Sequence, residues 1–278
     1  MTFEPPVVYG TPHAKAGIPM GLPGRPDAVP DSVIDGADLP GVTVRAASLR
    51  GDDHRFYGTT RQDAMGLWLL GPDVLLVCVA DGVGSQPEAH LGSALACRSL
   101  YEEAEPVARR LLDPDEDTAG EIADGIAQRM LAAIAADPVT YATTLTAAVV
   151  ELTPSGEPRH CVVFAVGDSP ALLLRDGEFT SLLDTDADTD GDIVDGRTAA
   201  LPLHPGTVRT ATVELGADDA LVVCTDGLTG PMHDEKVRAQ LAEWWRRPVP
   251  GLLEFGWQLA FRAKSHTDDR TAVCVWGS

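Results

Sequence analysis

Acidic residues stand beside apolar, strand-like segments at five places in this sequence. They are Asp63 in RQDAM, Asp81 in CVADG, Asp168 in VFAVGDS, Asp226 in VVCTDG and Asp268 in SHTDDRTAVCVW. A carboxylate beside a core strand is costly to bury unless it is paired or binds a cation. The basic residues within two positions of these acids are Arg61 and Arg270, too few to neutralise all of them. Because oxygen-rich clusters suit hard divalent cations, the pattern indicates a magnesium or manganese site.

Apolar patterns predict the elements that position these acids. Segments 64–70 and 73–80 predict an antiparallel hairpin that leads into Asp81. Other strands are predicted at 42–48, 143–152, 160–166, 170–177, 178–183, 208–215, 220–226 and 271–276. Helices are predicted at 94–111 (divided by Pro106), 122–133, 234–245 and 251–263. Strands in runs, separated by pairs of helices, predict an α+β domain with helices outside antiparallel sheets.

Length, charge and the first residues bound the class of protein. The 278 residues suffice for one sizeable core, and we expect a Pro/Gly-rich tail at 1–40 before a single domain at 41–278. A formal net charge of -21 disfavours nucleic acid and anionic membranes as partners. Neither a signal peptide nor a membrane span is evident, which favours a cytoplasmic protein. The five widely spaced cysteines are expected to be reduced core residues.

Five motifs taken together resemble one enzyme family. ADGVGS, YATTLTAAVV, FAVGDSPALLLRDGEF, LVVCTDGLTGPMHDEKV and TDDRTAVCVW are similar, in this order, to motifs of the metal-dependent type 2C protein serine/threonine phosphatases, the PPM family, of bacterial type. The likeness runs from about residue 42 to 278. It implies a four-layer αββα sandwich, in which helix pairs flank two antiparallel sheets. It also implies two manganese or magnesium ions, or three in bacterial members, and a metal-activated water that attacks phosphoserine or phosphothreonine.

The resemblance implies a role for each acid from its place in a motif. Asp81 matches the aspartate that bridges two metals, and Gly82 matches the glycine whose carbonyl also binds metal. Asp226 and Asp268 match the other ligands of the first metal. Asp168 matches an acid that helps to hold a third, weaker metal in bacterial members.

Two further acids are placed by the same comparison of motifs. Asp268 is the expected ligand rather than Asp269, because the family pattern of Asp, Asn, any residue and Thr aligns with 268–271. Asp63 matches the acid of a Glu-Asp-Ala motif that supports the metal waters.

Several positions depart from the family pattern. Gln62 stands where most members have a glutamate ligand of the second metal, although an amide oxygen can also coordinate. The phosphate-gripping arginine is expected at the position of Gly58, and the sequence leaves Arg55 and Arg61 open as substitutes. Two more family side chains, a histidine and an arginine, are replaced by Val83 and Pro170.

Two kinds of function fit these residues. One is an active phosphatase that acts on phosphoproteins and opposes a kinase; the other is a weak or inactive phosphatase-like module that binds a phosphoprotein or a kinase. The departures favour the module, but the retained acidic cluster favours the enzyme, which is the expected function. The acidic loop 184–197 begins like an EF-hand, but Arg197 occupies the place of the bidentate glutamate. By resemblance, this loop is a flap beside the active site.

Overall fold

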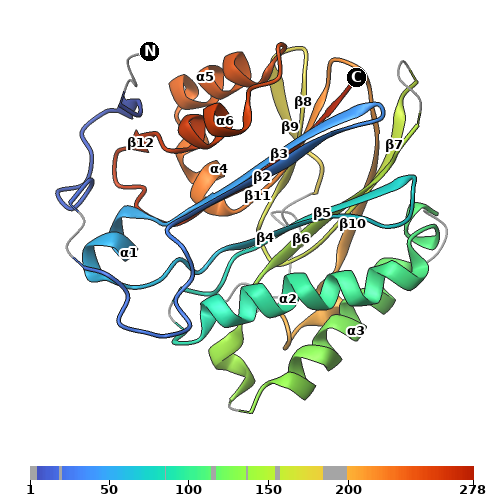
Figure 1. Ribbon diagram of the computed structural model, residues 1–278, viewed down its shortest axis with the longest axis horizontal. Coiled ribbons are helices and arrows are strands. Elements are labelled where there is room, and N and C mark those ends of the chain that lie inside the picture. Colours follow the sequence, from blue (N-terminus) through green and yellow to red (C-terminus); the bar gives the residue numbers. More distant parts are fainter. Residues whose placement is uncertain are drawn as a thin grey trace, which may run out of the picture.

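Two antiparallel sheets face each other between layers of helices (Figure 1). This computed structural model describes residues 5–18, 21–84, 86–113, 117–135, 137–153, 157–183 and 199–278. The five-stranded sheet has the order β10-β7-β6-β5-β4, with bounds β4 Ala64–Leu69, β5 Val74–Ala80, β6 Leu145–Glu151, β7 Arg159–Val166 and β10 Arg209–Leu215. The six-stranded sheet has the order β2-β3-β13-β11-β8-β9, with bounds β2 Ser32–Leu39, β3 Val42–Leu49, β8 Ala171–Arg175, β9 Glu178–Ser181, β11 Ala220–Cys224 and β13 Arg270–Gly277.

Helices cover the outer face of each sheet. Figure 1 shows α2 and α3 along the five-stranded sheet and α4, α5 and α6 against the six-stranded sheet. The helices are α1 Asp52–Tyr57, α2 Ala89–Ala104, α3 Thr118–Ala133, α4 Asp226–Met232, α5 Glu235–Trp245 and α6 Leu252–Leu259. As expected, α2 ends just before Pro106, which lies in a 3-10 turn. The pair of short strands β1 (Val8–Tyr9) and β12 (Arg262–Ala263) is parallel.

The core has three apolar layers that explain the sequence pattern. Val77 and Val163 of one sheet meet Val223 and Val275 of the other between the sheets, and two further layers lie under the helices. A strand buried on both faces reads as a continuous apolar run, as every residue of β5 does. All five cysteines are buried and free. The predicted αββα sandwich of two antiparallel sheets is confirmed.

The sheet begins earlier in the chain than the sequence pattern indicates. The tail is predicted to reach residue 40, but Ser32–Leu39 pairs with β3 along its whole length as strand β2. This strand lies at the edge of the sheet and none of its residues is fully buried, so it lacks the apolar alternation that would reveal it. The structure therefore places these residues in the sandwich.

Candidate active site

The registers of the two sheets bring the acids to one end of the sandwich. The end of β11 pairs with the start of β13, so Asp226 and Asp268 lie at the same edge of the six-stranded sheet. In the other sheet, the end of β5 lies beside the start of β6, which pairs with the end of β7. Asp81 and Asp168 follow those two strand ends. Four acids that are far apart in sequence therefore meet.

A pocket of about 430 Å³ opens between these strand ends. Its acidic lining consists of Asp81, Asp168, Asp226 and Asp268. Most of the remaining lining is apolar or weakly polar, and His204 also borders it. Among the described residues that line this pocket there is no lysine or arginine. Among the described lining residues, the carboxylates of Asp81, Asp226 and Asp268 therefore have no side-chain cation to balance them.

The charges of these acids oppose one another. The pKa of Asp81 is raised to about 11, mainly by burial and to a smaller extent by the charges of the neighbouring carboxylates. Asp81 also shares a hydrogen bond with Asp226. Burial and then the charge of Asp269 raise the pKa of Asp268. A cluster of this kind is fully ionised at neutral pH only when a cation balances it. Its all-oxygen donor set fits magnesium or manganese.

The backbone of Asp81 is fixed from both sides. Its carbonyl accepts hydrogen bonds from the Thr144 N–H and the Thr143 hydroxyl, both at 2.8 Å, and its N–H donates to Oγ1 of Thr144 at 3.1 Å. The next residue, Gly82, has no room for a side chain, because a Cβ there would lie 2.6 Å from the carbonyl oxygen of Ala89. The threonines thus position the acid, a role that their place at the start of a strand did not reveal.

Asp63 is close to the cluster but does not line the pocket. Its side chain is buried, and Oδ2 accepts hydrogen bonds from the hydroxyls of Thr225 at 2.9 Å and Thr271 at 2.6 Å. Burial and the charge of Asp269 raise its pKa well above the ordinary value. Thr225 immediately precedes Asp226, and Thr271 follows Asp268 by three residues. Asp63 therefore braces the strand ends that carry the other acids.

Asp269 has a structural environment that separates it from its neighbour Asp268. Its buried carboxylate accepts hydrogen bonds from the backbone N–H groups of Gly51 at 2.7 Å and Gln62 at 2.5 Å. The same carboxylate contacts Nδ1 of His54 at 2.8 Å. Asp268, in contrast, lines the pocket, as the motif alignment predicts for a ligand.

Replacing Asp269 with alanine is expected to lower the free energy of unfolding by about 3 kcal/mol, because several buried donors lose a charged acceptor. Thermal and urea denaturation would measure this change. Asp38→Ala is the matched control, since the Asp38 side chain is 76% exposed, and it should change stability by less than about 0.5 kcal/mol. Equal stability of the two variants would contradict the bracing role of Asp269.

The two arginines proposed as phosphate grips are not brought to the pocket. Arg61 is buried and donates to the carbonyl of Asp63 at 2.8 Å and to the hydroxyl of Ser48. Arg55 donates two hydrogen bonds to the carboxylate of Asp31, from Nε at 3.0 Å and from Nη2 at 2.9 Å. Neither side chain is among the residues that line the pocket. Both arginines hold the fold together in this arrangement.

Gln62 faces a second cavity, of about 410 Å³, which shares Gly84 and Gln86 with the acidic pocket. Gly58 borders the same cavity. A Cβ at Gly58 would lie 3.2 Å from the carbonyl oxygen of Leu22, because the N-terminal segment crosses directly over this position. The tail therefore occupies the space into which a side chain at position 58 would project.

Val83 and Pro170 from the sequence analysis, and one further histidine, have clear surroundings. Val83 lines the acidic pocket, whereas the carbonyl of Pro170 accepts a hydrogen bond from the N–H of Cys224 at 3.1 Å. His204, which lies outside the five motifs, borders the pocket. A lone histidine in a loop carries no local signal of this position. The acidic loop 184–197, and with it the flap expected there, lies outside the described residues.

The comparison with protein families decides the relationship of this chain. The family model described as protein phosphatase 2C matches residues 50–250. The chain belongs to the protein phosphatase 2C family. The predicted family and its class of enzyme, the protein serine/threonine phosphatases, are thereby confirmed. No curated protein matches the sequence.

Solved structures share the fold of this family member. RsbX in complex with magnesium has a TM-score of 0.57 at 18% identity, over 88% of this chain and 100% of that one. The serine/threonine phosphatase of S. agalactiae has a TM-score of 0.57 at 16% identity, over 89% and 100%. The PPM Ser-Thr phosphatase MsPP from Mycobacterium smegmatis, in complex with cacodylate, has a TM-score of 0.55 at 20% identity. The match covers 90% of this chain and 100% of that one. Within the described part of the chain, no helix has the length and apolar character to cross a bilayer.

Proposed function

We propose that this chain hydrolyses phosphoserine and phosphothreonine in proteins at a binuclear manganese or magnesium centre. The observation that carries the proposal is the convergence of Asp81, Asp226 and Asp268 on one pocket that has no side-chain cation among its described lining residues. A module that only bound phosphate would be served by basic side chains, whereas these acids repel it. The acidic lining is therefore best explained by metal ions that receive the phosphate.

The lining of the pocket and the family motifs support the following set of ligands. Asp81, Asp226 and Asp268 would hold the first ion, and the carbonyl of Gly82 would also bind metal. Gln62 would belong to the second site and Asp168 to a weaker third site. When bound, such ions supply an activated water and offset the charge of the phosphoryl oxygens. The threonines around Asp81 and Asp63 hold the carboxylates in place for this task.

His204 is the proposed acid for the leaving group. Val83 is apolar where the family has a histidine, and His204 is the histidine among the described residues that line the pocket. Its Nδ1 lies 3.4 Å from the backbone nitrogen of Ala200, so Nε2 is the ring nitrogen that is not engaged by this contact. We propose that the protonated ring donates its Nε2 proton to the departing oxygen and is left as a neutral imidazole.

The variant His204→Gln should lower kcat/KM for phenyl phosphate about 100-fold, because phenolate is a poor leaving group without a proton. Hydrolysis of para-nitrophenyl phosphate should fall much less, since nitrophenolate leaves unprotonated. Steady-state assays of both substrates would measure the difference. His160→Gln, a change at a distant histidine paired with Glu214, serves as the control. Equal losses for both substrates would count against the proton transfer.

The activity itself is tested by hydrolysis of para-nitrophenyl phosphate and of a phosphothreonine peptide. We expect turnover with manganese or magnesium and none with a chelator. Absence of turnover with every metal, from protein that is shown to be folded, would favour the phosphatase-like binding module instead. The proposed cellular substrates are cytoplasmic phosphoproteins of a signalling pathway, including a kinase or its targets.

Gln62→Glu is expected to lower the manganese concentration for half-maximal activity roughly tenfold, because it adds a negative charge beside the second metal site. A titration of activity with manganese would measure the change. Gln86→Glu adds the same charge to the rim shared by the two cavities and should have a smaller effect. Unchanged metal dependence of Gln62→Glu would remove Gln62 from the set of ligands.

A further inference from the structure

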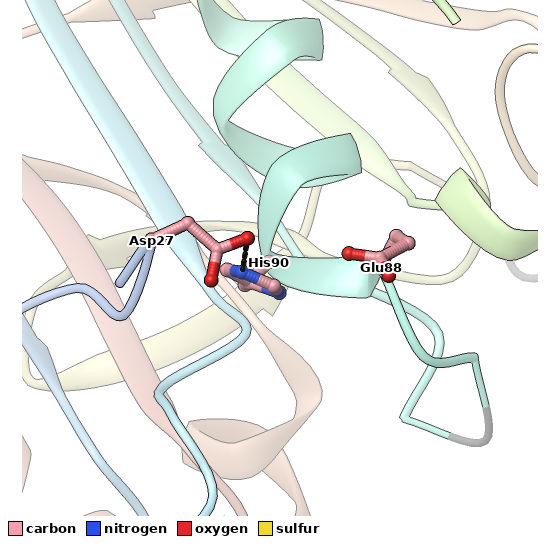
Figure 2. A group of neighbouring side chains, drawn as sticks. All are labelled: Asp27, Glu88 and His90. Atoms are coloured by element: carbon pink, nitrogen blue, oxygen red, sulfur yellow. Dashed lines mark ion pairs between the residues drawn. The ribbon is translucent and has the colours of Figure 1, made fainter. Parts of the chain in front are cut away.

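A second group of metal-binding residue types lies where the N-terminal segment meets the start of α2. It consists of Asp27, Glu88 and His90, here called the tail–helix cluster (Figure 2). One ligand atom of each side chain lies within 4.8 Å of those of the other two. In the described part of the chain, no other three residues of these types come so close together. The cluster has no residue in common with the lining of the acidic pocket.

The histidine of this cluster has an unsatisfied nitrogen. His90 is 3% exposed, and its Nε2 is buried without a hydrogen-bond partner. The same atom lies 3.6 Å from Oδ2 of Asp27, too far for a hydrogen bond but directed at the carboxylate, as Figure 2 shows. Buried polar atoms in native proteins nearly always have a partner. This nitrogen is therefore an unpaired potential metal ligand that faces the carboxylate of Asp27, and the carboxylate of Glu88 lies in the same cluster.

A cation already lies between those carboxylates. Arg25 donates to both carboxylate oxygens of Asp27, at 3.0 and 2.9 Å, and to Oε2 of Glu88 at 2.5 Å. Its side chain is 39% exposed, so it can turn towards solvent. The guanidinium leaves Nε2 of His90 unpaired, whereas a metal ion would bind all three groups. The cluster thus presents one nitrogen and two carboxylate ligands to a cation.

We propose that Asp27, Glu88 and His90 form an accessory site for a zinc ion, which displaces Arg25 when it binds. Zinc is bound in proteins by histidine nitrogens and carboxylate oxygens, and a site with three protein ligands keeps a fourth position for water. In a tetrahedral site the ligand atoms are about 3.3 Å apart, so the side chains must draw together by an ångström or more. Asp27 and Glu88 are 33% and 27% exposed, which leaves their side chains room to move.

The position of the site gives zinc a structural effect. Asp27 belongs to the segment that crosses Gly58, whereas Glu88 and His90 begin the helix that follows the loop 81–87. Zinc would join this segment to the start of α2, the helix that follows Asp81 in the chain. The site is independent of the proposed phosphatase activity, and zinc binding can be measured without substrate.

Isothermal titration of the full-length chain with zinc chloride alone tests the site. The starting protein carries Asp226→Asn and Asp268→Asn, which weaken zinc binding in the acidic pocket. We expect one zinc ion per chain, with an affinity that falls at least tenfold when Asp27→Asn or Glu88→Gln is added. Removal of the competing cation by Arg25→Gln should raise the affinity several-fold.

The matched control uses a similar arrangement that lacks a histidine. Arg129 lies between Glu102 and Glu103 on the surface, so Glu103→Gln should leave zinc binding unchanged. His90→Gln should act like the carboxylate variants, and those variants decide the question if this buried change unfolds the chain. Zinc binding that is absent from the starting protein, or that survives both Asp27→Asn and Glu88→Gln, would overturn the proposal.

Discussion

Asp81→Asn, and separately Asp226→Asn, should lower metal-dependent kcat/KM by at least about 1,000-fold, which corresponds to about 4 kcal/mol of transition-state stabilisation. Both carboxylates line the acidic pocket and share a hydrogen bond. An asparagine keeps the size of the side chain but removes the charge that holds a divalent cation. The loss should appear with manganese and with magnesium, because both ions need the same oxygen ligands.

Assays with para-nitrophenyl phosphate and a phosphothreonine peptide, across a range of metal concentrations, would measure this loss. Asp218→Asn is the matched control, since the Asp218 side chain is 96% exposed and does not line the pocket. Circular dichroism would establish that each variant is folded. Near-normal activity of Asp81→Asn at saturating manganese would contradict the proposed centre.

In a chelator, the free energy of unfolding should fall as the pH rises from 5 to 8. The pKa of Asp81 is raised to about 11 in the folded chain, whereas an unfolded aspartate has a pKa of about 3.9. Between these values the folded state holds a proton that the unfolded state has released. Stability is therefore greatest at low pH and falls by up to about 1.4 kcal/mol per pH unit for this one group. Burial and the charge of Asp269 also raise the pKa of Asp268, which acts in the same direction.

Urea denaturation at several pH values would measure this slope. Asp81→Asn should flatten the slope and should stabilise the metal-free chain at pH 8, whereas Asp218→Asn should keep it. Manganese should oppose the loss of stability at pH 8, because it binds the ionised carboxylates of the folded state. A wild-type slope that Asp81→Asn leaves unchanged would show that this acid is not held protonated without metal.

The family and the arrangement of layers could be predicted from sequence because their signals are local. Apolar runs such as Val74–Ala80 are long enough to reveal buried strands, and each acidic motif adjoins such a run. Antiparallel pairing within each sheet places Asp81 beside Asp168 and Asp226 beside Asp268, and the packing of the two sheets brings these pairs together. Strand β2 escaped prediction because an exposed edge strand has no apolar period.

Only the tertiary structure decided what each polar side chain faces. Asp268 and Asp269 are adjacent in sequence, yet Asp268 lines the pocket and Asp269 accepts hydrogen bonds from backbone N–H groups. No local pattern distinguishes a side chain that faces solvent from one that faces the backbone. Arg61 turns inwards for the same reason. The tail–helix cluster joins Asp27 to His90, 63 positions apart. The sequence by itself determined the strands and their acids, whereas long-range packing decided the partners, because burial and charge pairing depend on chain segments that are distant in sequence.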